Sequence, residues 1–485
     1  MKKTLKSILI FVVLTAFVVP LLIGCPSNDP NPIDERPTDI NEENENRDDL
    51  LMHELPPDLN FNGQEFRIHN TRRDHNPFVL TVITVEEDTG EALDTAIFRR
   101  NQRVEELLNI RIVETPHDNP GSVNNRVRQS VNAASDDLEL AICAAVDAFR
   151  LAQGNMIIPL DRVPFVNLEK GYWDQNMIRD LSIGDRVHFL TGDFSLNAYA
   201  ATVVFFFNKD LKMTLGLPDF YDLVRRGEWT LDRFEEFIAV ATMDLNNDGI
   251  INFNDRIGFV SWHGYRVNFL SGAGQNFITR DENNFPVMGF DNETFIDAFR
   301  RVFDIMTTSN VFYGPGQQAN LVFQESRILF WADLLHWANS LRGMEADFGV
   351  LPFPKLNAQQ ENYVSTTGNI HVFVIPRTNT NLQMTGAVLE ALNSDSARNV
   401  VEVYFENLVK GKNLNRDEES WEMLDEFIFN NRKYDITRFY FEDVILNPHN
   451  NLFANRDRDI SAFIEARRNT INAAIERSIA VFMEE

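Results

Sequence analysis

The stretch LELAICAAV, residues 138–146, is a nearly continuous run of apolar side chains. Such a run is typical of a strand buried inside a parallel sheet. Upstream of it, strand-like and helix-like segments alternate, at residues 65–69, 79–85, 94–108, 110–113 and 123–134. This alternation predicts an α/β lobe.

Two more apolar runs lie further along the chain, VVFFFN at residues 203–208 and VFVIP at residues 372–376. We expect each to form a strand, with helices over residues 385–391 and 459–483. A length of 485 residues suggests about three domains, and two lobes plus a tail would also fit.

The charge composition excludes nucleic acids as a class of partner. The chain carries 72 acidic against 45 basic side chains, so it has no basic excess to neutralise phosphates, and we expect no nucleic-acid partner. Its two cysteines, Cys25 and Cys143, cannot build a disulfide framework. Cys143 lies inside the opening apolar run, where we expect a small buried side chain.

The first 24 residues resemble a targeting segment. Lysines at positions 2, 3 and 6 precede an apolar stretch at residues 7–23, and the motif LIGC ends at Cys25. The motif resembles the lipobox of bacterial lipoproteins, which implies that residues 1–24 are a signal peptide and that Cys25 carries lipid, palmitate included. An uncleaved membrane anchor and an ordinary signal peptide are the alternatives.

Residues 25–58 are rich in Pro, Asn, Asp and Glu and contain few apolar side chains. Such a segment buries too little apolar surface to offset the entropy lost on ordering. We therefore expect a disordered acidic tether between the membrane and the folded part.

The segment DLNNDGIINFND, residues 244–255, has the oxygen spacing of a calcium loop. The expected ligands are five side chains and the backbone carbonyl of Ile250: Asp244, Asn246, Asp248, Ile250, Asn252 and Asp255. A helix over residues 230–241 and a strand after Arg256 would flank the loop, which suggests a structural calcium ion. A surface turn without metal is the alternative, because Asn, Asp and Gly also form turns.

Several motifs, spread in order over nearly the whole chain, resemble one protein family. They are NG at 62–63, RN at 100–101, TGD at 191–193, FNKDL at 207–211, GEWT at 227–230, FGVLPFPK at 348–355 and NRDEES at 415–420. Together with the lipobox and the calcium-like loop, they resemble the family 1 extracellular solute-binding lipoproteins of bacterial ABC importers. Within that family they are most similar to members that serve sugar and oligosaccharide uptake.

This resemblance implies an α/β, two-lobed periplasmic-binding-protein-like fold with an interdomain cleft and multiple hinge crossings. Lobe one is expected at residues 59–200 and 362–408, and lobe two at residues 205–360 and 412–485. The crossings are expected near residues 199–204, 363–369 and 407–413.

The resemblance also implies a function. A monomer, anchored by lipid at the extracytoplasmic face of the bacterial cell membrane, would capture a carbohydrate in the cleft. It would then deliver the carbohydrate to the membrane subunits of an ABC permease.

Candidate ligand-binding residues lie at expected strand ends. Trp331 and Trp262 could stack on the apolar face of a sugar ring, with Asp333 beside Trp331 as a hydrogen-bonding group. Core packing is the alternative for both tryptophans. Lobe one contributes polar candidates that could instead be turn or capping residues: Asn70, Arg72, Asp147 and Asp193.

Known catalytic motifs are absent from the sequence, so we expect no enzyme activity. Two alternatives stay open. A secreted surface glycoside hydrolase would need two carboxylates flanking one bond, and 72 acidic residues do not exclude such a pair. An adhesive or structural surface lipoprotein is the other.

Overall fold

The computed structural model describes residues 51–72, 83–85, 89–368, 370–409 and 417–484. All of them belong to one compact unit, Arg47–Glu485. The predicted signal peptide, the lipidation site Cys25 and most of the tether lie outside the described residues. Within the described residues, no helix is both long enough and apolar enough to cross a membrane.

The first sheet has five strands in the order β2-β1-β3-β13-β4. Their bounds are β1 Gln64–Thr71, β2 Ile110–His117, β3 Leu140–Ala144, β4 Ile157–Ile158 and β13 His371–Pro376. β1 runs parallel to β2 and β3, whereas β13 is antiparallel to β3 and β4. Helices between and after these strands are α2 Ala92–Leu108, α3 Pro120–Asn132, α4 Ala145–Gln153 and α13 Leu382–Asn399.

The opening run LELAICAAV forms β3 and then turns directly into α4. The predicted strand over residues 138–146 is therefore too long at both ends. Ala144 keeps an extended backbone as the N-cap of α4, and Ala148, Leu151 and Ala152 continue the buried face as a helix. This early turn brings the start of α4 to the carboxyl end of a buried strand.

Residues 83–85 are irregular, and the remainder of the predicted strand 79–85 lies outside the described residues. The carbonyl of Ile83 accepts hydrogen bonds from the side chains of Arg100 and Asn101, at 2.7 and 2.8 Å. The carbonyl of Ile83 is thus paired with side-chain donors instead of the backbone of a neighbouring strand. The other predicted strands and helices of this lobe occur, and most of their ends differ by at most about four residues. The helix predicted over residues 385–391 is much longer, because α13 spans Leu382–Asn399.

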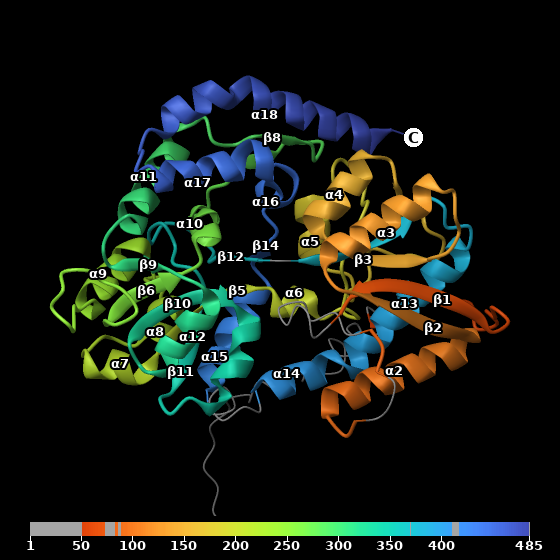
Figure 1. The fold of residues 1–485 in the computed structure, drawn as a ribbon, viewed down its shortest axis with the longest axis horizontal. Helices are drawn as coiled ribbons and strands as arrows, with labels where there is room; N and C mark the ends of the chain where they lie inside the picture. The colour runs from red at the N-terminus through yellow and green to blue at the C-terminus, as the bar shows by residue number, and fades with distance from the viewer. Residues whose placement is uncertain (1–50, 73–82, 86–88, 369, 410–416, 485) are drawn as a thin grey trace, which may run out of the picture. The chain divides into compact units, whose positions relative to one another are not determined.

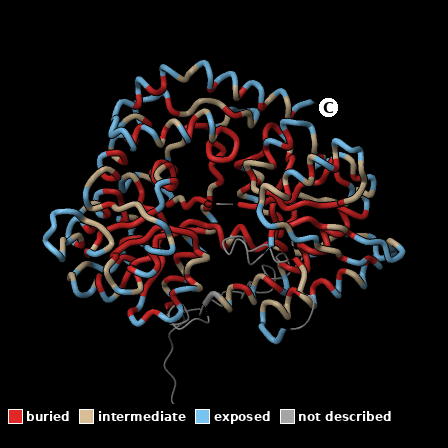
Figure 2. The backbone as a smooth tube through the Cα atoms, in the orientation of Figure 1, coloured by how far each residue is buried: buried red, intermediate tan, exposed pale blue. Residues whose placement is uncertain are grey.

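The second sheet has the order β11-β5-β10-β6-β9. Its strands are β5 Val203–Asn208, β6 Ile257–Ser261, β9 Val311–Tyr313, β10 Ile328–Leu334 and β11 Phe348–Leu351. β5 is antiparallel to β10 and β11, and β10, β6 and β9 run parallel to one another. The two sheets occupy opposite sides of Figure 1, and buried residues follow the strands of both (Figure 2).

Further elements lie between β4 and β12 in the chain. They are η1 Leu160–Arg162, α5 Gln175–Leu181, α6 Asn197–Ala200, α7 Lys209–Thr214, α8 Phe220–Arg225, α9 Leu231–Ala241, η2 His263–Tyr265, α10 Arg266–Gly272, β7 Ile278–Arg280, β8 Pro286–Met288, α11 Glu293–Met306, α12 Gly316–Gln324 and η3 Leu335–Gly343.

The chain passes from the first sheet to the second before β5 and returns before β13. Thr202 and Thr367 form an antiparallel bridge between these two passages. A third segment joins them, because β12 Ser365–Thr366 pairs in parallel with β14 Arg432–Lys433. The fold thus has several crossings, as expected, while the exact lobe boundaries stay a prediction.

The last part of the chain is helical and contacts elements of both lobes. Its elements are α14 Val401–Val409, α15 Glu418–Glu422, η4 Met423–Phe429, α16 Ile436–Tyr440, η5 Glu442–Leu446, α17 Asn447–Ala454 and α18 Ile460–Met483. α18 packs against α4, which follows the first sheet, and against α11 and β8, which belong to the second lobe. In Figure 1 it spans the top of the described unit.

Candidate functional site

A cavity of about 440 Å³ lies at the ends of strands from both sheets. Its walls include residues 144–146, directly after β3, and residues 262–264, directly after β6. The passage into β13 and the segment from α16 to α17 complete it. We call this the cleft cavity. In open α/β sheets, the carboxyl ends of parallel strands are where ligands bind.

Trp262 is the exposed aromatic side chain of the cleft cavity. It follows the last residue of β6, and 40% of its surface is accessible. Its ring meets that of Tyr265 edge-on, with centroids 5.3 Å apart. A side chain at position 264 would collide with the indole, because a Cβ on Gly264 would lie 1.8 Å from it. The glycine therefore leaves room for this orientation of Trp262.

Two residues of the cavity wall each have one buried polar atom without a hydrogen-bond partner among the described residues. These atoms are Nδ1 of His371 and Oδ1 of Asn450. Burial lowers the pKa of His371 to about 4, so this imidazole is neutral at physiological pH. Unpaired buried polar atoms cost free energy. A ligand with hydroxyl groups could serve both atoms, because a hydroxyl donates and accepts.

Arg438 fixes the C-terminal wall of the cleft cavity. Its guanidinium donates to the carbonyl of Gly264 at 3.1 Å and lies over the Tyr265 ring, 5.5 Å from the centroid. Burial lowers the pKa of this guanidinium. α16 is thereby attached to the turn that carries Trp262.

Asp333 lies behind this wall, in β10. It is 6% exposed, and the backbone N–H of Leu334 donates to its carboxylate at 2.8 Å. Burial raises the pKa of Asp333 to about 7, while a hydrogen bond from Tyr265 acts in the opposite direction. Neither Asp333 nor Tyr265 is part of the cavity wall, so the structure does not place Asp333 against a ligand in this cavity.

Trp331, which we expected to enter the cleft, lies in the core instead. The strand predicted to end at Trp331 continues to Leu334, so Trp331 is in the middle of β10. Its side chain is fully buried, with the rings of Phe206, Phe323 and Trp337 5.3 to 5.8 Å away. This position does not support stacking on a ligand.

The lobe-one candidates do not line the cleft cavity. Asn70, at the end of β1, donates to Glu114 at 2.9 Å, and Arg72 lies 3.4 Å from Asp118. Asp147 is one residue beyond the wall residue Val146 and pairs with Arg150 at 3.5 Å. Asp147 is the nearest of the three in sequence to the wall.

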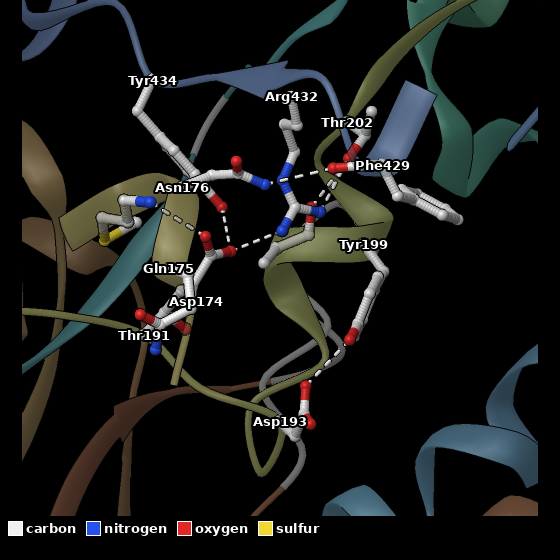
Figure 3. A network of polar contacts seen from close by, with 12 residues as sticks. Asp174, Gln175, Asn176, Thr191, Asp193, Tyr199, Thr202, Phe429, Arg432 and Tyr434 are labelled. Carbon is white, nitrogen blue, oxygen red and sulfur yellow. Dashed lines mark hydrogen bonds and ion pairs between the residues drawn. The ribbon is translucent and has the colours of Figure 1, made fainter. Parts of the chain in front are cut away.

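Asp193 lines a different cavity, of about 230 Å³, at the crossings between the lobes (Figure 3). This crossing cavity is bounded by residues 171–176, by residues 192–193 and 198–199, and by residues 429–432. Asp193 and Trp262 are therefore parts of two separate cavities. The structure does not bring these two candidates together, and their roles in binding stay predictions.

The sequence reading missed the C-terminal contribution to the cleft cavity. Arg438, Glu442, Asn447 and Asn450 come from α16, η5 and α17, which the sequence analysis left unassigned. Two start signals were present, since Asp435 caps α16 and a proline stands at the start of α17. No local signal indicates that these helices reach a cavity whose other walls include residues 144–146, 262–264, 368 and 370–371.

The calcium-like loop joins α9 to β6, as predicted. Met243 and Arg256 close its base with two backbone hydrogen bonds of 2.9 and 3.1 Å. Asp244 accepts from the N–H groups of Asn247 and Gly249 at 2.6 and 2.8 Å. Asp255 accepts from Leu245 and Asn252 at 3.0 and 2.9 Å, and these backbone donors lower its pKa.

The loop residues fit calcium in donor type and in order, because carboxylates, amides and one carbonyl follow the calcium-loop spacing. Asn247 and Gly249 have φ of 60° and 78°, which gives the sharp turn that such a loop needs. In the part of the chain that the structure describes, no three His, Cys, Asp or Glu side chains converge as a metal site. Asp244, Asp248 and Asp255 would therefore have to draw together on binding.

A scan against protein-family models finds no match, and a search of curated proteins finds none. Solved structures do match. The maltose/maltodextrin-binding domain MalE from Bdellovibrio bacteriovorus, bound to maltotriose, has a TM-score of 0.52 and 12% identity over 86% of this chain and 98% of that chain.

Two further structures are similar. The ABC substrate-binding protein Lmo0181 from Listeria monocytogenes, in complex with cycloalternan, has a TM-score of 0.51 and 10% identity, covering 87% of this chain and 98% of its own. UgpB from Mycobacterium tuberculosis, in complex with glycerophosphocholine, has a TM-score of 0.55 and 12% identity, covering 80% and 97%. At these identities the similarity establishes the fold, which is the two-lobed fold of periplasmic binding proteins.

Proposed function

We propose that this chain is a non-catalytic, carbohydrate-binding component of an ABC importer and belongs to the family 1 extracellular solute-binding lipoproteins. It captures an oligosaccharide in the cleft cavity and delivers it to a membrane permease. A ligand that contacts both lobes binds the closed arrangement more tightly than the open one, and it therefore favours the closed arrangement.

One observation carries this proposal: the wall of the cleft cavity combines an exposed indole with polar atoms that lack protein partners. Trp262 offers an apolar face, and His371 and Asn450 offer unpaired hydrogen-bonding atoms. Sugars present both an apolar ring face and hydroxyl groups, so this wall is complementary to them. Two of the similar structures contain bound saccharides, which adds support.

The glycoside hydrolase alternative receives less support. Among the described residues that line the cleft cavity, Glu442 is the only acidic side chain. Hydrolysis of a glycosidic bond generally requires a pair of carboxylates about 5 to 9.5 Å apart. A single carboxylate fits ligand binding better than bond cleavage.

Thermal shift assays with maltotriose, cycloalternan and glycerophosphocholine test the proposal. We expect a saccharide to raise the melting temperature, because a ligand that binds only the native state stabilises it. Small-angle scattering of the same complex should show compaction. Released shorter sugars would indicate an enzyme, and a melting temperature unchanged by every saccharide tested would contradict carbohydrate binding.

The proposal includes a lipid anchor at Cys25 and a location at the extracytoplasmic face of the cell membrane. It rests on the lipobox-like motif at residues 22–25 and on the acidic tether that follows. We also propose a calcium ion in the loop of residues 244–255, in a monomeric protein. Labelling with a fatty-acid probe tests the anchor: Cys25→Ser should abolish the label, and an unchanged label would contradict it.

A further inference from the structure

The crossing cavity contains a balanced ion pair and one carboxylate without a paired cation. Arg432 lies 2.5 Å from Asp174, and the hydroxyl of Tyr434 donates to the same Asp174 oxygen at 2.5 Å (Figure 3). Arg432 also donates to the carbonyl of Ala198 at 3.1 Å. The charge of Arg432 is thereby matched within the protein.

The carboxylate of Asp193 has no paired cation among the described residues. Its Oδ1 accepts a hydrogen bond from the Tyr199 hydroxyl at 2.9 Å, and no described basic side chain lies within ion-pair distance. Burial raises the pKa of Asp193 to about 7, with Asp174 adding to the effect while Tyr199 and Arg432 oppose it. Asp193 therefore retains unused capacity to accept hydrogen bonds.

The same cavity also contains an unused donor. Nε of Arg432 is buried and has no hydrogen-bond partner among the described residues. The amide side chains of Gln175 and Asn430 are exposed at the rim of the cavity. An occupant would thus meet an acceptor at Asp193, a donor at Arg432 and the amide of Asn430. Gln175 offers only its amide oxygen, because its Nε2 already donates to three backbone carbonyls.

We propose that the crossing cavity is a second binding site, which takes one small neutral polyol no larger than a monosaccharide. Hydroxyl groups can donate to Asp193 and accept from Arg432, so one molecule satisfies both side chains. This site is separate from the cleft cavity and does not depend on the function proposed for it.

Charge and size both favour this ligand class. An anion would be repelled by Asp193 above about pH 7, where this carboxyl is mostly ionised. A cation would meet Arg432, which already lies over the rings of Tyr199 and Phe429, 5.5 and 5.9 Å from their centroids. The volume of about 230 Å³ is roughly half that of the cleft cavity, at about 440 Å³, so an extended saccharide would not fit.

Ligand-observed NMR titrations of the full chain with xylitol, glycerol and glucose test the proposal. All proteins carry Trp262→Ala, which impairs the cleft cavity. We compare this background with added Asp193→Asn, which keeps an acceptor for Tyr199, and with added Asn430→Ala at the exposed rim. Asp185→Asn, an exposed aspartate outside the cavity, is the matched control.

We expect saturable binding of at least one polyol to the Trp262→Ala protein. Asp193→Asn should weaken it tenfold or more, Asn430→Ala should weaken it less, and Asp185→Asn should leave it unchanged. No saturable binding up to tens of millimolar would overturn the proposal. Binding that both Asp193→Asn and Asn430→Ala leave unchanged would overturn it as well, since the polyol would then bind elsewhere.

Discussion

Trp331 lies in β10 and Trp262 directly follows the neighbouring strand β6 of the same sheet, yet their surroundings differ completely. Trp331 pairs with Val260 across β10 and β6, two residues before Trp262 in the chain. Trp331 is fully buried among aromatic rings, whereas Trp262 exposes 40% of its surface at the cleft cavity. What separates them is their position relative to the end of the strand.

This difference shows that a strand end, more than a residue type, makes an aromatic side chain available to a ligand. β10 continues three residues beyond Trp331, so its indole packs between the sheet and α12. β6 ends one residue before Trp262, so its indole projects beyond the sheet. We therefore expect the same type of side chain to contribute to stability at position 331 and to ligand binding at position 262.

The largest effect is expected for Trp331→Ala. Removing a large buried aromatic side chain leaves a cavity, which costs about 3 to 5 kcal/mol of unfolding free energy. Denaturant unfolding measures this cost, and Trp331→Phe should lose markedly less. If Trp331→Ala kept its stability but lost saccharide affinity, the assignment of Trp331 to the core would be wrong.

Asp333, two residues after Trp331, should make stability depend on pH. Its pKa is raised from 3.8 to about 7, so the folded state takes up the proton more readily than the unfolded chain. Its contribution is present below about pH 4 and is lost as the pH rises through about 7, by up to about 4 kcal/mol.

Urea unfolding of the wild type and of Asp333→Asn at pH 5 and pH 8 measures this contribution. Asp333→Asn should gain stability relative to the wild type at the higher pH, and Asp185→Asn should not. Buried His371 and His449 have lowered pKa values and act in the opposite direction, so the difference between the proteins is the readout. A constant difference across this range would contradict the prediction.

Trp262→Ala should act on binding instead of stability. Loss of an aromatic contact with a sugar ring should weaken saccharide binding by about 1 to 3 kcal/mol. Trp421→Ala is a matched control, because Trp421 is 37% exposed and lies outside the cleft cavity. Calorimetric titration of both variants gives the comparison, and equal affinities would remove Trp262 from the binding site.

The comparison also explains which parts of the molecule could be predicted from sequence. The alternation of apolar runs and helical segments was sufficient for the α/β class, because strand and helix periods are local properties. The end of β10 was not predictable to within three residues, because Ala332 and Leu334 can extend a strand as readily as they can leave it. Because the predicted strand ended three residues too early, we expected Trp331 in the cleft, whereas the structure places it in the core.

The cleft cavity itself was only partly predictable. Trp262 was found because it follows a clear strand, but His371, Arg438 and Asn450 come from distant segments. Their convergence depends on the packing of α16 and α17 against the turn after β6, which no local pattern specifies. Asp193 was a polar residue of the right kind, but the path of the chain through the crossings brings it to another cavity.

The smallest effect concerns the other end of β6, where the loop of residues 244–255 leads into the strand. Calcium binding would draw Asp244, Asp248 and Asp255 together and hold the loop closed. For a dissociation constant of about 0.1 to 1 mM, 1 mM calcium would stabilise the fold by about 0.4 to 1.4 kcal/mol. Melting curves with calcium and with chelator measure this shift, and Asp248→Ala should abolish it.

Saccharide affinity provides the second readout for the loop. Trp262 lies at the opposite end of β6 from the loop, and the strand between them is fully buried. We therefore expect chelation to lower the melting temperature but to leave saccharide affinity nearly unchanged. Identical melting curves would identify the segment as an ordinary Asn- and Asp-rich turn. If chelation weakened saccharide binding as strongly as Trp262→Ala does, the loop would determine where β6 ends. The residues that stabilise this sheet and the residue that binds the saccharide would then not act independently.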